Sequence, residues 1–270
     1  MSPSLSATPI QRDVVIIFGE DAPEYIQTQL TQDVLPLDRG RSSWSFILTP
    51  KSEIEAMVRV TRTADGFILD TALGHGDAVR RRLDGPLFRM DVQFSQDTWS
   101  GVSWRGEGAH DIGGDAAIVA ELPWSRADAV DEVGPDVQAP TGTTGLSPDE
   151  LEALRIGACW PAEAEINGNV TPAMTGIVDH TVSFDKGCYT GQEFVARVHF
   201  RDAAPPQRLV QMTFEPGADV AAGAEIMVDG EPAGTVTSVV SSLGVGLCYC
   251  KRSVMLPAEG VAGPVPVVLR

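Results

Sequence analysis

The sequence predicts an α+β fold that ends in a small β-barrel. Three observations support this prediction. A strand, a helix and a three-stranded meander follow one another in residues 1–85, a smaller set of strands follows in residues 86–144, and short strands separated by turns fill residues 205–270. With 270 residues and 43% hydrophobic side chains, the chain has enough apolar material for a core spread over two or three small lobes.

The first lobe begins in residues 1–85. Residues 14–18, V-V-I-I-F, form a short apolar run typical of a buried strand, and Asp21 can cap the helix that follows. A meander is expected between residues 43 and 71, because turns with the sequences T-P-K-S and T-A-D-G separate three apolar stretches. A helix over residues 77–83 completes a split, ferredoxin-like α+β unit.

A second, smaller α+β lobe is predicted from residues 86–144. Residues 88–94 alternate apolar and polar side chains, which is typical of a half-buried strand. Further strands are expected near residues 99–104 and 116–122, and a short helix is expected near residues 126–132.

Residues 145–204 are expected to return to the first lobe. The sequence S-P-D-E at residues 147–150 places Ser at the N-cap, Pro at the first helical position and Glu at the third, so a helix starts here and ends near Gly157. Residues 163–180 are loop-like and lead into a strand that ends at Phe184.

The small β-barrel is predicted from residues 205–270. Asp229-Gly230 is a turn signal between two of its strands. Cys248 and Cys250 flank Tyr249 on one strand, so both side chains point to one face and are expected to fill the core. Five short strands are expected, over residues 208–214, 225–228, 235–240, 245–251 and 265–269.

Charge and composition exclude several classes of function. A net charge of −17 disfavours direct binding to nucleic acid or to an anionic membrane surface. No apolar run is long enough to span a bilayer, and the first residues lack the features of a signal peptide, so we expect a cytoplasmic protein. The four cysteines form no C-x-x-C pair and no His cluster accompanies them, so no resident metal site is expected.

The candidate functional segment is residues 183–201, S-F-D-K-G-C-Y-T-G-Q-E-F-V-A-R-V-H-F-R. A helix is expected to begin at Thr190 with a capping box to Glu193. Cys188 then lies just ahead of a helix N-terminus, which favours an anion, and Lys186 adds a positive charge. Both effects favour the thiolate, the nucleophilic and metal-binding form of the side chain. In the simpler alternative, Cys188 is a buried apolar residue and Lys186 a solvated loop charge.

Several motifs resemble one protein family. K-G-C-Y-T-G-Q-E followed by V-A-R resembles the hallmark of the YgfZ family, folate-binding iron–sulfur proteins related to the glycine-cleavage T-protein (aminomethyltransferase). Residues 29–34, the run L-R-I-G-A-C-W-P and the run G-T-V-T-S-V-V-S-S resemble further family segments. The resemblance implies a T-protein-like cloverleaf in which two ferredoxin-like lobes surround a central channel, with a folate-binding region at residues 1–204 and the barrel at residues 205–270.

The resemblance also implies a site for tetrahydrofolate in that channel. Tyr189 is expected to stack on a planar ligand or simply to pack, and Arg155 to meet an acidic ligand or to lie on the surface. Thr31 is expected near the cavity or as a cap at the end of the first helix. Glu193 and Arg197 are spaced for an i,i+4 ion pair. The residues expected at the channel rim are Lys186, Cys188, Tyr189, Gln192, Glu193 and Arg197.

Two functions of different classes follow. The first is a folate-binding protein that assists assembly or repair of iron–sulfur enzymes, with Cys188 and Lys186 as its reactive groups and with client or assembly proteins as partners. Any cluster would be a transient ligand shared with another chain, because a single Cys cannot hold one. The alternative is a tetrahydrofolate-dependent one-carbon transferase or demethylase. Ala56 and Met57 stand where the transferases carry acids, so that chemistry lacks its carboxylate unless Glu53 or Glu55 supplies it. A protein-binding scaffold is a third option.

Overall fold

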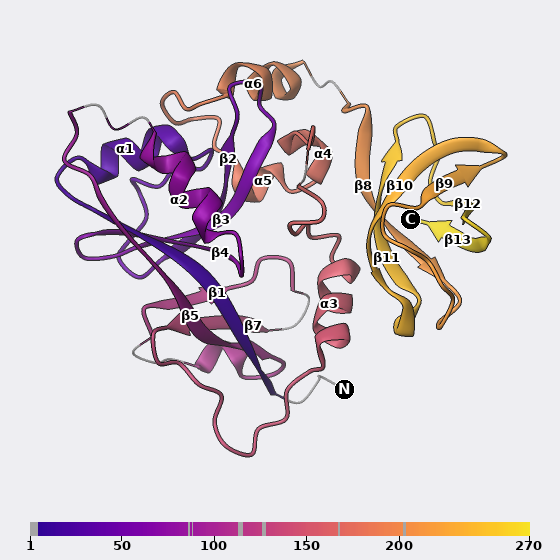
Figure 1. Cartoon of the computed structure of the whole chain (residues 1–270), viewed down its shortest axis with the longest axis horizontal. Coiled ribbons are helices and arrows are strands. Elements are labelled where there is room, and N and C mark those ends of the chain that lie inside the picture. The colour runs from indigo at the N-terminus through magenta and orange to yellow at the C-terminus, as the bar shows by residue number, and fades with distance from the viewer. Residues whose placement is uncertain are drawn as a thin grey trace. The chain divides into compact units, whose positions relative to one another are not determined.

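Seven antiparallel strands form one continuous sheet in the first of two units of the chain (Figure 1). The computed structural model describes residues 5–85, 87, 89–112, 116–125, 128–166, 168–201 and 204–270. The first unit comprises Met1–Leu146 with Asp179–Gln192, and the second comprises Ser147–Val178 with Glu193–Arg270. In spatial order the strands are β2 (Ser42–Leu48), β3 (Ile54–Arg62), β4 (Gly66–Ala72), β1 (Ser6–Phe18), β5 (Gln93–Arg105), β7 (Ala129–Gly134) and β6 (Ile118–Glu121).

Strands β1 and β5 are long enough to join the two predicted lobes into this single sheet. Each has 13 residues, and they pair along their whole length, from Ser6 opposite Arg105 to Phe18 opposite Gln93. The stretches predicted as separate strands near residues 88–94 and 99–104 therefore meet within β5, which begins only at Gln93; Phe88 lies outside the described residues. The α+β class and the meander of β2, β3 and β4 are confirmed.

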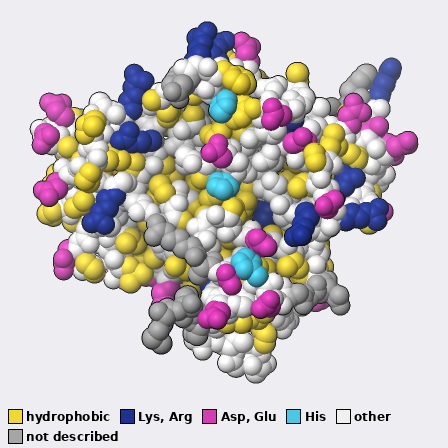
Figure 2. Space-filling view, turned by 180° about the vertical axis from the view of Figure 1, so that it is seen from behind, with side chains coloured by type: hydrophobic (Ala, Val, Ile, Leu, Met, Phe, Trp, Pro, Cys, Tyr) yellow, Lys and Arg dark blue, Asp and Glu magenta, His cyan; other side chains and the backbone are white. Residues whose placement is uncertain are grey.

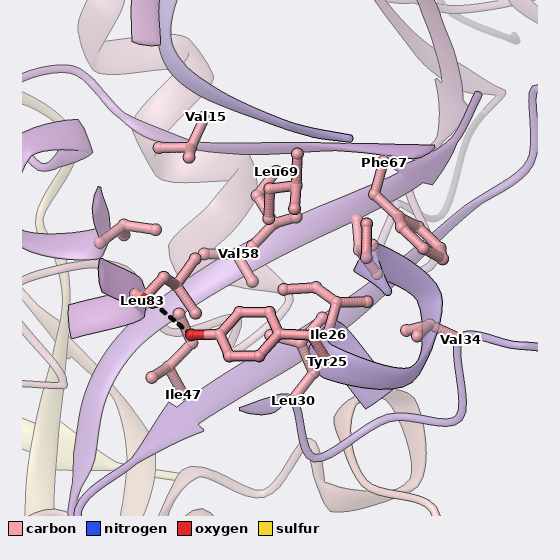
Figure 3. Close-up of a cluster of buried hydrophobic side chains, with 14 of the residues drawn as sticks. Val15, Tyr25, Ile26, Leu30, Val34, Ile47, Val58, Phe67, Leu69 and Leu83 are labelled. Carbon is pink, nitrogen blue, oxygen red and sulfur yellow. Dashed lines mark hydrogen bonds between the residues drawn. The ribbon is translucent and has the colours of Figure 1, made fainter. Parts of the chain in front are cut away.

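Helices α1 (Ala22–Gln29) and α2 (Gly76–Asp84) pack on one face of this sheet. Figure 3 shows the core between them, in which the ring of Tyr25 lies among aliphatic side chains from both helices and from the strands. The Tyr25 hydroxyl donates to the carbonyl of Leu83, so the one polar atom of this side chain ties α1 to α2. Asp21 is the N-cap of α1 as predicted, but its carboxylate accepts from the N–H of Asp91 and not from its own helix.

Two local predictions in the first unit are wrong. The helix expected over residues 126–132 is strand β7, paired between β5 and β6, although residues 126 and 127 lie outside the described part. Both acidic residues of this strand are buried, where Asp131 accepts from Ser103 and Glu132 from the Trp104 indole. The strand expected to end at Phe184 is irregular chain that follows α5 (Val178–Thr181).

The second unit contains α3 (Pro148–Gly157), α4 (Pro172–Thr175), most of α6 (Gln192–Phe200) and a closed barrel. The capping box predicted at the start of α3 is present, since Ser147 and Glu150 bond reciprocally. The barrel order is β10 (Glu231–Val240), β11 (Val245–Lys251), β8 (Gln207–Phe214), β13 (Val265–Leu269), β12 (Ala258–Ala262) and β9 (Glu225–Val228). The barrel and the burial of Cys248 and Cys250 in its core are confirmed. Strand β12 was not predicted, because A-E-G-V-A has a weak apolar alternation.

Asp13 on β1 anchors the start of α2. Its carboxylate accepts from the N–H groups of Gly74 and Gly76 at 2.8 and 3.0 Å, and from the hydroxyl of Thr98 at 2.8 Å. Burial alone would raise the pKa of Asp13, but these hydrogen bonds outweigh it and hold the pKa below its ordinary value. Asp13 is therefore ionised in the folded protein well into the acid range.

We expect Asp13→Ala to lower the free energy of unfolding at neutral pH by about 2–3 kcal/mol, because it leaves buried N–H groups without an acceptor. The pKa of Asp13 is lower in the folded protein than in the unfolded chain. Its carboxylate therefore stabilises the fold fully at pH values above the unfolded pKa, and this stabilisation is lost as the pH falls through the folded pKa. The difference in the free energy of unfolding between wild type and variant should therefore become smaller in acid. Urea unfolding at several pH values measures it, with the exposed Asp65→Ala as control; equal losses in the two variants would contradict the assignment.

Candidate functional site

Lys186 holds the candidate functional segment against the end of α1. The side chain is 9% exposed, and its ammonium donates to three main-chain carbonyls at 2.6–2.8 Å, those of Gln27, Leu30 and Gln32. The last carbonyls of a helix have no partner within the helix, and they form the negative end of its dipole. An ammonium group has three N–H donors and a positive charge, so it matches this helix end in both respects.

The charge of Lys186 is thus engaged by main-chain oxygens. Burial lowers the pKa of Lys186 to about 8, with Asp33 opposing the shift, so at neutral pH the side chain still carries three N–H groups. The ammonium also lies 5.3 Å from the centre of the Tyr189 ring, which is within the range of a cation–π contact. These contacts make Lys186 an anchor of the segment; whether it also acts on Cys188 stays a prediction.

Thr31 connects the segment to β2. Its hydroxyl donates to the carbonyl of Thr181 at 2.6 Å and accepts from the N–H of Phe46 at 2.9 Å. Its carbonyl accepts from the N–H of Ser183 at 3.0 Å. Thr31 is fully buried, so its polar atoms serve this junction. A contact between Thr31 and a ligand remains a prediction.

Gly191 allows the segment to approach the turn between β2 and β3. It has a φ of +81°, and a Cβ at this position would lie 2.6 Å from the carbonyl oxygen of Thr49. Its own carbonyl accepts from the Ser52 hydroxyl at 2.5 Å. The N–H of Thr190 donates to the carbonyl of Thr28 at 3.3 Å. Because α6 begins only at Gln192, the capping box predicted between Thr190 and Glu193 is wrong: the Thr190 N–H donates to Thr28, and the Glu193 carboxylate accepts from Arg197.

Cys188 is exposed on this anchored segment. The other three cysteines, which are also among the described residues, are less accessible: Cys159 is partly buried, and Cys248 and Cys250 are fully buried. Burial raises the pKa of Cys159 to about 11 and that of Cys248 still further, so these thiols stay protonated at neutral pH. Cys188 is therefore the cysteine positioned to meet a reagent or a partner from solution.

Two predicted rim residues form the expected ion pair on α6. The guanidinium of Arg197 donates to the Glu193 carboxylate at 2.7 Å, four residues apart on the helix. Both side chains are exposed, so the pair contributes only about 0.3–0.5 kcal/mol and mainly orients the two groups. Gln192, the first residue of this helix, is partly exposed.

Arg155 lies in the second unit, where its guanidinium is buried and fully bonded. It donates to Glu152 at 2.8 Å, to Glu165 at 3.0 Å and to the Ser238 hydroxyl at 2.9 Å. It also donates to the carbonyl of Trp160 at 2.5 Å. Arg155 thus ties α3 to β10 of the barrel, and its assignment to an acidic ligand stays a prediction.

A hollow in the first unit was missed by the sequence reasoning. It has a volume of about 390 Å³ and lies between β2 and β6, the two edge strands of the sheet, which come into contact because the sheet coils. Arg59 and Trp44 line it from β3 and β2, and His180 lines it from α5. None of residues 186–191 lines it. A signal was available, since an Arg in the middle of an apolar strand is rarely buried without a specific reason.

Neither a metal centre nor a membrane span is found in the described part of the chain. Its His, Cys, Asp and Glu side chains form no group of three or more that could hold a metal ion. No helix formed by these residues is both long and apolar enough to cross a bilayer.

On the face in Figure 2, acidic side chains are spread out and interspersed with Lys and Arg, so the net charge of −17 does not gather in one patch there.

Comparisons with known proteins give a consistent assignment, although no family model matches the sequence. An uncharacterized protein of Haemophilus influenzae is 27% identical over 258 residues, which is 91% of this chain and 87% of the relative. A Vibrio vulnificus protein named tRNA-modifying protein YgfZ is 26% identical over 208 residues, covering 70% of this chain and 64% of the relative. A protein of the same name from Escherichia coli is 26% identical over 213 residues, with 69% and 65% coverage.

The match to these YgfZ proteins therefore spans just under two thirds of their length. Among solved structures, the glycine cleavage system aminomethyltransferase T from Bartonella henselae superimposes with a TM-score of 0.78, covering 98% of this chain and 85% of that one. At 17% identity this likeness concerns the fold. The named relatives and the fold agree, and together they support a YgfZ-family assignment for this chain, with a T-protein-like fold.

Proposed function

We propose that this chain is a tetrahydrofolate-binding protein that assists the assembly or repair of iron–sulfur enzymes, with Cys188 as its reactive group. The observation that carries the proposal is the anchoring of residues 179–192 to α1 and β2 by Lys186 and Thr31. This anchoring keeps Cys188 exposed on a segment whose main chain is fixed on both sides. A thiol that must meet another protein needs both properties, accessibility and a defined position.

The name of the relatives supports an accessory role. Those proteins are named as tRNA-modifying, whereas a net charge of −17 on this chain disfavours direct contact with a phosphate backbone. An accessory protein that acts on a modifying enzyme, and not on the tRNA, agrees with both observations. Bound tetrahydrofolate would supply a carrier of one-carbon units. The chain's own residues would bind and orient it and present Cys188.

The transferase alternative finds less support in the first unit. Ala56 and Met57 occupy the strand positions where the transferases carry their acids, and both are nearly buried. Glu55 pairs with Arg82 at 2.5 Å, and Glu53 accepts from the hydroxyl of Thr49 at 3.3 Å. Both nearby carboxylates are therefore engaged elsewhere, and the proton-transfer role has no evident group.

We expect Cys188 to react first with iodoacetamide in the native protein, because Cys248 and Cys250 are enclosed in the barrel core. Mass spectrometry of the partly alkylated protein identifies the labelled residue. Cys188→Ser should keep the midpoint of thermal unfolding within about 2 °C of wild type but fail to restore growth to a strain lacking its own YgfZ-family protein. Cys159→Ser serves as the control. Full rescue by Cys188→Ser would remove the thiol from the proposed function.

We expect Lys186→Met to lower the free energy of unfolding by about 2–3 kcal/mol, because three carbonyls at the end of α1 lose their donor. Urea unfolding measures the change. Lys51→Met, at an exposed turn position, removes the same charge without a buried bond and should be nearly neutral. If the two variants were equally stable, Lys186 would not be the anchor of the segment.

We expect tetrahydrofolate to bind, and the bound protein to show no turnover with methyl or aminomethyl donors. Isothermal titration calorimetry under anaerobic conditions measures binding, and chromatography of the folate products detects turnover. Release of methyl- or methylene-tetrahydrofolate would favour the transferase alternative. Absence of any heat of binding across the millimolar range would overturn the folate part of the proposal.

A further inference from the structure

Ser52, in the turn between β2 and β3, has a main-chain conformation that suits glycine. Its φ is +67°, in the left-handed region that is unfavourable for a residue with a Cβ atom. Three other described residues besides the glycines have a positive φ, namely Arg89, Cys159 and Asp229. Among these four residues only Ser52 is buried, with 2% of its surface exposed. A glycine would relieve the strain, so a side chain at this position needs another reason.

The turn itself closes without the Ser52 hydroxyl. The N–H of Ser52 donates to the carbonyl of Thr49 at 2.9 Å, and the N–H of Thr49 donates to the carbonyl of Glu53 at 2.9 Å. The Thr49 hydroxyl accepts from the N–H groups of Lys51 and Glu53 at 3.1 and 3.2 Å. These bonds use main-chain groups and the side chain of Thr49, so a glycine at position 52 could make the same turn.

The Ser52 hydroxyl is instead bonded to the segment that carries Cys188. It donates to the carbonyl of Gly191 at 2.5 Å, 139 residues further along the chain. Because Ser52 is buried, water cannot readily replace it as the donor. Gly191 also lies very close to the turn, since a Cβ on it would be 3.2 Å from the Cα of Ser52. The hydroxyl therefore holds the main chain of Gly191 against the turn.

Cys188 lies between this contact and the Lys186 anchor. Two residues before Cys188, the Lys186 ammonium donates to three carbonyls at 2.6–2.8 Å. After Cys188, the N–H of Thr190 reaches the carbonyl of Thr28 at 3.3 Å, which is long for a bond of this kind. The shorter bond from Ser52 is therefore the stronger restraint on that side. Its loss would free the main chain after the thiol while Lys186 still held the main chain before it.

We propose that Ser52 is a positioning residue for Cys188, whose hydroxyl fixes the main chain that follows the thiol. The strained conformation of Ser52 is what places the hydroxyl against Gly191. This inference rests on the proposed role of Cys188 as the reactive group. A thiol that must meet a reacting atom of another molecule needs a defined position, and restraints on both sides of Cys188 supply one. Function then depends on the Ser52 hydroxyl, whereas stability also depends on the backbone conformation.

Two variants separate these dependences. Ser52→Gly removes the hydroxyl and relieves the strain, whereas Ser52→Ala removes the hydroxyl and keeps the strain. Thermal unfolding should therefore rank Ser52→Gly as the more stable of the two. In a strain lacking its own YgfZ-family protein, wild type should restore growth and both variants should fail, although iodoacetamide still labels Cys188 in each. Restored growth with Ser52→Gly would overturn the inference. If wild type itself does not restore growth, the proposed function fails, and the exchange experiment below decides the positioning.

Hydrogen exchange followed by mass spectrometry measures the restraint without an assay of function. In Ser52→Gly, the amides of residues 187–191 should exchange about fivefold faster than in wild type, which is the factor expected for the loss of one hydrogen bond. Asp229→Gly is the matched control, because Asp229 has a φ of +52° at an exposed turn of the barrel. This control should change neither the exchange of residues 187–191 nor growth. Exchange at the wild-type rate in Ser52→Gly would show that the hydroxyl does not restrain the segment.

Discussion

The contact between the Lys186 ammonium and three carbonyls at and just after the end of α1 fixes the course of residues 179–192. A helix end leaves several carbonyls without partners, and a buried one needs donors from elsewhere in the chain. Lys186 supplies three from about 155 residues away in sequence. Once it is fixed, Thr190 meets Thr28 and Gly191 reaches the turn before β3. The exposed position of Cys188 between these contacts follows from them.

Local sequence patterns were sufficient for much of the fold. The capping box of α3, the meander of β2, β3 and β4, and strands β9 and β11 depend on neighbouring residues, so the sequence showed them directly. Strand β7 was misread as a helix because its acidic residues are paired across the sheet, by Ser103 and the Trp104 indole, which no local pattern reveals. The start of α6 was misplaced for the same reason, since Thr190 is held by Thr28.

The candidate site shows a second limit of sequence reasoning. Lys186, Thr31 and Arg155 were predicted to meet a ligand, and each has its polar atoms bonded within the protein. A polar residue in a recognisable motif can be there to hold the main chain, and the motif alone does not distinguish this from chemistry. The hollow was missed for the opposite reason. Its lining runs from Ser42 to His180, on strands and loops that only the coiled sheet brings together.

The charge of the whole chain and the charges of its buried network act over different distances. A net charge of −17 acts through solvent-exposed groups, whose field falls off within about 10 Å at moderate salt, and it repels an extended phosphate backbone. The pairs of Arg59 with Asp70 and Asp131 are buried, so their charges are weakly screened and act strongly on one another. Because a buried guanidinium without partners would be costly, the two carboxylates are what allow Arg59 to lie inside the first unit.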